Sequence, residues 1–274
     1  MKTKEYFGTT KMFFASSGSM AIFSVLYPHR EKIIGIPDQG YFKGILKIVD
    51  DLNMKYTLLE TKNGLVIPEK IRDIDLFIFS SFSGHIVENN VEKIVSHCKK
   101  NNILSVEDIS AGVSHPSFGK GDIIVCSTGS PKLLECKWGG FAAYRSGNES
   151  ELFKYMVIPQ GYKKKLKMQI DGAESKLRRL LRYSKILKDF DFDVLFESFE
   201  GPSVFIRTDI PKKIVKKLNK EVRPDVGYSL FSRCPRFDRV QKAGFVIETI
   251  KVWERDEDEI LDIGRKIERV IKNA

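Results

Sequence analysis

The first half of the chain alternates short apolar runs with segments whose apolar residues recur at helical spacing. The predicted strands are Lys11–Ala15, Lys32–Ile36, Lys55–Leu59, Asp73–Phe79, Ile103–Val106, Asp122–Cys126 and Gly140–Tyr144. The predicted helices lie near Ser19–Tyr27, Tyr41–Leu52 and Val91–Lys100. Continuous apolar strands that alternate with helices indicate a mostly parallel sheet covered on both faces. We therefore expect an α/β fold with three layers, α/β/α.

The pattern changes after about Asn148. Apolar residues recur at steps of about three and four from Leu166 to Leu187, and Lys and Arg occupy the other face, which predicts one long amphipathic helix. Further strands are expected at Val194–Phe196, Val204–Arg207 and Val246–Val252, and helices near Pro211–Leu218 and Glu257–Ile271. This pattern predicts a large domain over residues 1–160, a connecting helix over 161–189, and a small α+β domain over 190–274.

Composition limits the class of protein. Apolar residues make up 42% of the chain and charged residues 30%, a balance typical of globular proteins rather than disordered ones. No apolar run approaches the roughly 20 residues that a membrane helix needs. The first ten residues, MKTKEYFGTT, lack the apolar segment of a signal peptide. We therefore expect a cytoplasmic protein without a membrane anchor.

The net charge of +10 has two interpretations. It could attract an anionic partner such as nucleic acid, or it could belong to a solvated lysine-rich surface. Because the basic residues are spread along the whole chain, the second interpretation is favoured and nucleic acid is not an expected partner.

Several common signatures are absent from the sequence. It contains no GxGxxG fingerprint, no GxxxxGK[ST] phosphate loop, no GxSxG elbow and no HExxH motif. The four cysteines have no CxxC spacing and the four histidines are scattered, so no metal site is expected. His85 and His115 lie in predicted loops, where surface or loop-bracing roles are favoured over contact with a ligand.

Candidate chemistry lies where predicted strands end. Ser16 to Ser19 stand between a strand and an apolar helix, where small residues let backbone N–H groups approach an anion. A plain helix cap would have the same sequence. Asp108 follows a predicted strand, at the edge where parallel sheets bind ligands. Glu107 precedes it, and because strand side chains alternate, only one of the two carboxylates can face the same crevice.

The segment after the predicted strand Asp122–Cys126 carries hydroxyl residues followed by an amine. It reads Ser127-Thr128-Gly129-Ser130-Pro131-Lys132. The hydroxyls can bind a phosphate while the lysine amine attacks an aldehyde, which suits a phosphorylated carbonyl compound. One solvated lysine among many is the alternative interpretation of Lys132.

Taken together, these motifs resemble pyridoxal 5′-phosphate (PLP) enzymes of fold type I, and most closely the DegT/DnrJ/StrS sugar aminotransferases. Ser17-Gly18-Ser19-Met20-Ala21 is similar to that family's phosphate-binding turn. Ile36 to Tyr41 resembles the segment whose aromatic residue stacks on the pyridine ring, here Tyr41. The spacing of Gly121-Asp122, Ser127, Lys132 and Gly139-Gly140 resembles the surroundings of the family's Schiff-base lysine.

The resemblance covers roughly residues 14–144 and implies a role for each of these residues. Lys132 would form the Schiff base, Asp108 would pair with the pyridine nitrogen, and Ser127 would contact the cofactor phosphate. Gly18, Ser19, Met20 and Tyr41 would complete the cofactor site. The implied protein is a homodimeric PLP-dependent aminotransferase that moves an amino group from an amino acid donor to a keto acceptor, with a keto sugar as one candidate acceptor.

The chain also departs from the family. It is shorter than most relatives, the residue three after Asp108 is Ala111 rather than a polar one, and Phe79-Ser80-Ser81 lacks the family's histidine. Arg233 is a candidate for binding a substrate carboxylate, with an ordinary surface loop as its alternative. A lyase, cysteine-sulfur chemistry, or a non-catalytic basic binding protein on the same scaffold stay open as alternatives to aminotransfer.

Overall fold

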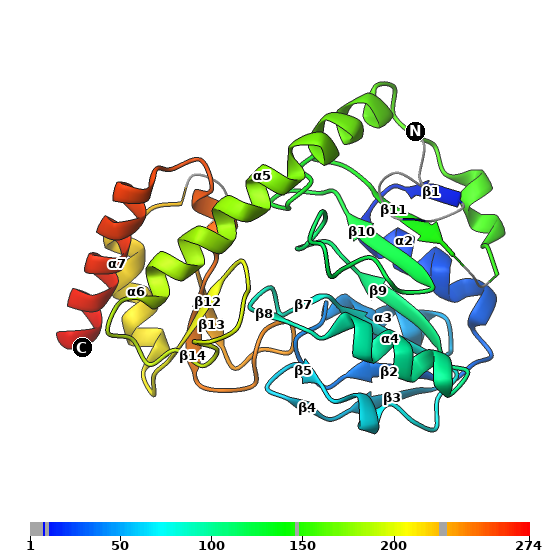
Figure 1. Cartoon of the computed structure of the whole chain (residues 1–274), viewed down its shortest axis with the longest axis horizontal. Coiled ribbons are helices and arrows are strands. Elements are labelled where there is room, and N and C mark those ends of the chain that lie inside the picture. The colour runs from blue at the N-terminus through cyan, green and yellow to red at the C-terminus, as the bar shows by residue number, and fades with distance from the viewer. Residues whose placement is uncertain (1–7, 9–10, 146–147, 225–228) are drawn as a thin grey trace.

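The computed structural model describes residues 8, 11–145, 148–224 and 229–274 (Figure 1). The expectation of no signal peptide concerns the first ten residues, and apart from Gly8 these lie outside the described part. No described helix is both long and apolar enough to cross a membrane.

A seven-stranded sheet with the order β1-β11-β10-β9-β6-β2-β3 forms the centre of the molecule. Its strands are β1 (Lys11–Ala15), β2 (Ile34–Pro37), β3 (Tyr56–Leu59), β6 (Leu76–Ser80), β9 (Leu104–Asp108), β10 (Ile123–Ser127) and β11 (Gly140–Tyr144). All neighbouring pairs from β10 to β3 are parallel, whereas β11 runs antiparallel to both β10 and β1. The predicted α/β class and the mostly parallel sheet are therefore confirmed.

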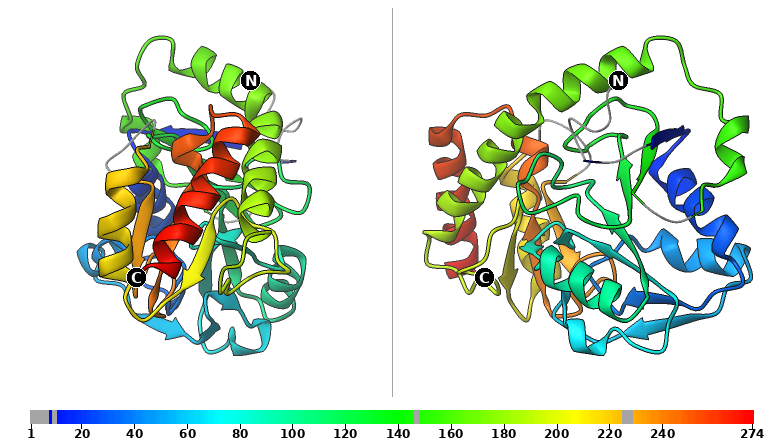
Figure 2. Two further views of the ribbon diagram at one scale, coloured as in Figure 1. Left: turned by 90° about the vertical axis from the view of Figure 1, so that its left-hand side faces the viewer. Right: turned by 45° about the vertical axis from the view of Figure 1, so that its right-hand side comes forward.

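Helices cover both faces of this sheet, as the alternation along its strands requires. In β10, Ile123 and Val125 face the core beneath α2 (Gly18–Leu26) and α3 (Gly44–Asp51). Ile124 and Cys126 face the opposite core, which the first half of α5 (Tyr162–Lys188) covers. On the same side as α5, α4 (Val91–Lys100) packs against β6. The three predicted layers are visible in Figures 1 and 2.

Helix α5 runs from the large sheet to the C-terminal part of the molecule (Figure 1). There its second half packs with α6 (Pro211–Glu221) and α7 (Glu257–Lys272) against an antiparallel sheet of order β12-β14-β13. The strands of this sheet are β12 (Val204–Arg207), β13 (Phe231–Cys234) and β14 (Gly244–Ile247). Residues 162–188 thus form the predicted long helix, while the predicted domain boundaries stay a prediction.

Two short hairpins and four 3₁₀ turns complete the described elements. The hairpins are β4 (Thr61–Lys62) with β5 (Leu65–Val66), and β7 (Phe82–Ser83) with β8 (Val87–Glu88). The 3₁₀ turns are Tyr27–His29, Pro68–Lys70, Glu151–Tyr155 and Thr249–Val252. Their brevity explains why hydrophobic periodicity does not predict them.

Three local predictions differ from the structure in bounds or type. The helix expected near Tyr41–Leu52 begins at Gly44, after a turn in which Gly40 has a positive φ of 79°. The strand expected over Val246–Val252 ends at Ile247 and continues as a 3₁₀ turn. The strand expected at Val194–Phe196 is only an isolated bridge between Val194 and Ile206.

Candidate active site

A cavity of about 280 Å³ opens at the edge of the sheet where the parallel strands end. Ligand sites of open α/β sheets occur at this edge. Turns that follow the strands line most of the cavity, and a hairpin tip and the C-terminal part supply the rest. The lining residues used below are Ser17, Gly18, Ser19, Gly40, Tyr41, Phe42, Gly84, His85, Asp108, Ser110, Cys126, Ser127, Lys132, Asp238 and Arg239.

One wall of the cavity is the N-terminus of α2. Ser17 caps this helix, since its Oγ accepts the Met20 N–H at 3.1 Å. The first turn of any helix leaves N–H groups without intrahelical acceptors, which favours an anion there. A β-carbon on Gly18 would lie 2.5 Å from the Ser127 β-carbon, so only glycine allows the two segments to touch. Gly18, Ser19 and the Ser127 hydroxyl together form a site suited to a phosphate.

Met20 is the one predicted cofactor residue that does not line the cavity. Its backbone N–H is already bonded to the Ser17 side chain, and its side chain packs against the core under α2. The contact expected between Met20 and a cofactor therefore has no support from the lining of the cavity and stays a prediction.

Asp108 and Glu107 face opposite sides of β9, as strand alternation requires. Asp108 lines the cavity, and its Oδ1 accepts the Ser110 N–H at 2.9 Å. Burial raises the pKa of the Asp108 carboxyl, which Ser110 and the Lys132 charge partly offset. A buried acid beside a lysine is the arrangement expected at a functional site.

Glu107 is fully buried on the other side and fixes the loop that leads to β10. Its carboxylate accepts four hydrogen bonds, from Ser81 Oγ at 2.6 Å and from the backbone N–H groups of Gly119, Lys120 and Gly121 at 2.7–2.8 Å. Such bonds to a charged acceptor are roughly twice as strong as neutral ones. Glu107 therefore has a structural role.

We expect Glu107→Gln to lower the free energy of unfolding by about 3 kcal/mol, because an amide leaves at least one of these buried donors without an acceptor. Chemical denaturation would measure the change, with Glu69→Gln as the control. Glu69 is exposed in the 3₁₀ turn Pro68–Lys70, so its replacement should change stability by no more than about 0.5 kcal/mol. Equal effects of the two substitutions would contradict the role given to Glu107.

Lys132 lies in the loop after β10 and lines the same cavity as Asp108. Its carbonyl oxygen accepts a hydrogen bond from Lys176 Nζ at 3.1 Å, which ties the loop to α5. Burial lowers the pKa of the Lys132 amine, as does Arg239, whereas Asp108 raises it. A lowered pKa increases the fraction of uncharged amine near neutral pH, and only this form is a nucleophile.

Tyr41 forms another wall of the cavity and is only 1% exposed. Its hydroxyl has no hydrogen-bond partner among the described residues. Burial and the neighbouring Asp108 charge raise the pKa of this hydroxyl well above 10, so it stays protonated. A buried donor without an acceptor is costly, and this one lies at a cavity that a ligand can enter.

Arg233 does not line this cavity, and its expected role in substrate binding stays a prediction. It lies on β13, where it is exposed, and it lines a separate groove with Lys212 and Arg236. The cavity contains Arg239 instead. Arg239 donates to Asp238 O at 2.7 Å and to Glu248 Oε1 at 3.1 Å, while its buried Nε has no partner among the described residues.

His85 also lines the cavity, although the sequence favoured a surface or loop-bracing role for it. It stands at the tip of the β7–β8 hairpin and has a positive φ of 62°. The available sequence signal is small: Gly84 is a residue typical of turns, and the flanking pairs Phe82-Ser83 and Val87-Glu88 each have one apolar and one polar residue.

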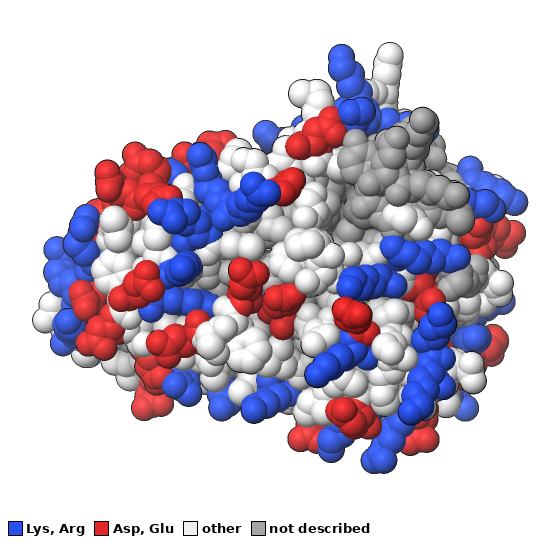
Figure 3. Space-filling model, viewed as in Figure 1, with Lys and Arg blue, Asp and Glu red and all other residues white. Residues whose placement is uncertain are grey.

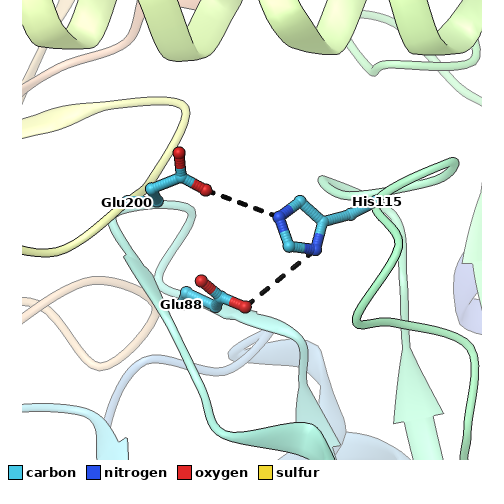
Figure 4. A group of neighbouring side chains, drawn as sticks. All are labelled: Glu88, His115 and Glu200. Carbon is cyan, nitrogen blue, oxygen red and sulfur yellow. Dashed lines mark ion pairs between the residues drawn. The ribbon is translucent and has the colours of Figure 1, made fainter.

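His115 lies outside the cavity and bridges two carboxylates (Figure 4). Its Nε2 is 3.5 Å from Glu200 and its Nδ1 is 4.0 Å from Glu88. The three side chains could in principle hold a metal ion. However, Nδ1 already accepts the Ser117 N–H at 3.3 Å, whereas a metal-binding histidine normally donates from its second nitrogen. His115 therefore joins Glu88 of the β7–β8 hairpin to Glu200 in the segment before β12. We call these three side chains the His115 clasp.

A family profile described as the MJ1341 family C-terminal domain matches residues 174–268, and no curated protein matches the chain. Among solved structures, 3-amino-5-hydroxybenzoic acid synthase superposes with a TM-score of 0.76 at 12% identity, over 98% of this chain and 88% of that one. The chain has the fold of fold-type I PLP-dependent enzymes.

Two further solved structures share this fold. The serine palmitoyltransferase from S. paucimobilis with a bound PLP–myriocin aldimine has a TM-score of 0.77 at 14% identity, over 99% of this chain and 75% of that one. The ureidoglycine–glyoxylate aminotransferase from Bacillus subtilis has a TM-score of 0.72 at 14% identity, over 98% and 82%. Because these enzymes catalyse different reactions, the likeness does not identify a substrate.

Proposed function

We propose that the cavity binds PLP and that the protein is a PLP-dependent aminotransferase, which moves an amino group from an amino acid donor to a keto acceptor. The observation that carries this proposal is that Lys132, Asp108 and the Gly18–Ser127 anion site line one cavity. An amine, an acid and an anion site are the three groups needed for a phosphorylated pyridine aldehyde. The fold shared with PLP enzymes supports the same assignment.

The residues present fit this cofactor in three respects. The close contact of Gly18 with Ser127 leaves bare backbone and a hydroxyl for the phosphate. The Asp108 carboxylate provides an acceptor for a protonated ring nitrogen. The Tyr41 hydroxyl has no hydrogen-bond partner among the described residues, and a ligand in the cavity would provide one.

When bound, PLP supplies an aldehyde that bonds to amines and a ring that withdraws electrons from the substrate. The residues of this chain perform the other tasks. Lys132 Nζ would hold the cofactor through its aldehyde, and the same amine would hold and move the proton of the substrate α-carbon. The Asp108 carboxylate would keep the ring nitrogen protonated, and the Tyr41 ring would form an apolar wall beside it.

We assign the donor's carboxylate to Arg239. Arg239 lines the cavity, its side chain is 13% exposed, and its buried Nε has no hydrogen-bond partner among the described residues. Burial alone would raise the pKa of its partner Glu248, but the Arg239 and Lys251 charges outweigh it and lower the pKa, so the pair is ionic. Glu248 thus holds the guanidinium in place.

Cysteine-sulfur chemistry is less well supported. Cys126 lines the cavity, and a cysteine desulfurase from Thermococcus onnurineus has the same fold with a TM-score of 0.71. However, burial and the Asp108 charge raise the pKa of the Cys126 thiol well above 9. Sulfur transfer needs a thiolate, so this cysteine is poorly suited to it.

A basic binding protein is also less well supported. Figure 3 shows Lys and Arg interleaved with Asp and Glu on the face viewed, rather than gathered into one basic surface. The expected homodimer and cytoplasmic location stay predictions, which light scattering in solution and cell fractionation would test.

Aminotransfer predicts two half-reactions, which can be separated. Protein loaded with PLP is mixed with each amino acid from a panel of twenty, and the keto acid released is measured. We expect one donor to release about one keto acid per subunit and then stop, and an added keto acid to restart the release. Continuous release of ammonia or of a keto acid without a second substrate would instead indicate a lyase.

A further inference from the structure

His85 occupies the tip of the hairpin formed by β7 and β8. Gly84 and His85 both take left-handed backbone conformations, with φ of 55° and 62°, and the Ile86 N–H donates to Ser83 O at 2.8 Å. These features define a β-turn whose two central residues have positive φ, positions that glycine and asparagine fill most readily. A histidine there is conformationally disfavoured, and such residues concentrate at functional sites.

The hairpin is fixed at both ends. At its tip, the Gly84 N–H donates to Gly40 O at 2.7 Å, and a β-carbon on Gly84 would lie 3.0 Å from the Arg239 α-carbon. At its base, the Glu88 N–H donates to Glu200 O at 2.9 Å, beside the His115 clasp. The backbone that carries His85 is therefore held at the cavity by contacts at both ends of the hairpin, as a binding residue requires.

Ser110 and Ala111 line the space beside His85. Ser110 Oγ accepts the Ser127 N–H at 2.8 Å, and Ala111, which lines a small adjoining pocket with His85 and Lys132, has no polar side chain. Lys132 and Arg239 are the charges that act on His85. An uncharged imidazole at this position can donate a hydrogen bond without adding a third positive charge beside Lys132 and Arg239.

We propose that His85 binds the ligand directly, by donating a ring N–H to an oxygen atom of the bound cofactor or of the substrate. This inference rests on the proposed function and names a residue that neither the sequence motifs nor the fold assigns to the site. Burial lowers the pKa of His85 well below 6.5, with Lys132 and Arg239 adding to the effect. The imidazole is therefore uncharged at neutral pH, with one nitrogen as donor and the other as acceptor.

Two substitutions separate ligand binding by the His85 side chain from the contribution of residue 85 to the turn. His85→Gly and His85→Asn both suit a left-handed turn, so both should fold at least as stably as the wild type. Asparagine keeps an N–H donor, whereas glycine has no side chain. Asn102→Gly is the matched control, because Asn102 also has a positive φ, of 56°, but lies after α4 and outside the cavity.

The affinity for PLP is measured by titrating the apo protein and following the visible absorption band, and the affinity for the amino donor by titrating the loaded protein. We expect His85→Gly to raise one of these dissociation constants about tenfold, as loss of a hydrogen bond to a charged oxygen would, and His85→Asn to raise it less. A change in the PLP constant assigns the oxygen to the cofactor, and a change in the donor constant alone assigns it to the substrate.

Two results would overturn the role of His85. Both constants could stay within twofold of the wild type in His85→Gly, or the loss of affinity could accompany a matching fall in the melting temperature of both variants. If the wild-type protein itself forms no Lys132-dependent band, the proposed function fails instead, so the two failures are distinguishable.

Discussion

Lys132→Ala is expected to abolish the visible absorption band of PLP-loaded protein and to lower the aminotransfer rate by about a thousandfold or more. The alanine variant has no amine in the cavity that can bond to the aldehyde or move the substrate proton. PLP would then associate only through its phosphate and ring, and gel filtration should remove it. Absorption spectra before and after gel filtration measure this loss.

Lys164→Ala is the control for this experiment. Lys164 is an exposed lysine near the start of α5 and does not line the cavity, so its replacement should leave both the band and the rate unchanged. A Lys132→Ala protein that folds normally and keeps the band would show that another amine holds the cofactor.

The lowered pKa of Lys132 adds a pH dependence. Protonated amine does not react, so incorporation of PLP should become faster as the pH rises toward the Lys132 pKa and should level off below pH 10.5, the ordinary value for lysine. Because the Asp108 charge raises the pKa of Lys132, Asp108→Asn should move this profile to lower pH. Stopped-flow absorbance at a series of pH values would follow it.

Asp108→Asn is expected to make the protein more stable while it weakens cofactor binding. Loss of a charge-assisted hydrogen bond should lower the PLP affinity roughly 10- to 100-fold. The aminotransfer rate should fall by about a hundredfold or more, because the ring nitrogen loses the group that keeps it protonated. Spectroscopic titration with PLP and single-turnover rates measure the two effects.

The sign of the stability change follows from linkage. Burial raises the pKa of Asp108 in the folded protein above its ordinary value of 3.8. The charged form therefore destabilises the fold, and this cost is absent at pH values below the unfolded pKa and complete above the folded one. At neutral pH the asparagine variant without PLP should accordingly melt at a higher temperature.

Asp50→Asn is the control for the stability measurement. Asp50 is exposed near the end of α3, and its replacement should change the melting temperature little. If Asp108→Asn melts lower than the wild type without PLP, or if it binds PLP as tightly, the role proposed for Asp108 is wrong.

The large sheet could be predicted from the sequence because each of its strands is marked by residues that are neighbours along the chain. Each buried strand is a short apolar run, and the parallel order follows from the helices between the runs. The sequence could group Asp108, Ser127 and Lys132, which line one cavity, for the same reason, since residues at the ends of parallel strands meet at one edge of the sheet. Which of Glu107 and Asp108 faces that edge could not be read from the alternation alone.

The rest of the site depends on contacts that local pattern does not contain. Arg239 reaches the cavity because its segment packs against residues about two hundred positions earlier, as the 2.7 Å bond from Gly40 N to Phe237 O shows. Arg233 has the same charge and comes six residues earlier, but it is exposed on β13. His85 was missed because two-residue strands give no periodic signal.

The most direct test of the central claim is to reduce PLP-loaded protein with borohydride, digest it, and locate the modified lysine by mass spectrometry. Reduction makes the bond between the amine and the cofactor permanent. The account predicts one pyridoxyl group per subunit, on the peptide that contains Lys132, and none on that peptide in Lys132→Ala. Label spread over exposed lysines, or absent from Lys132 while concentrated elsewhere, would contradict it.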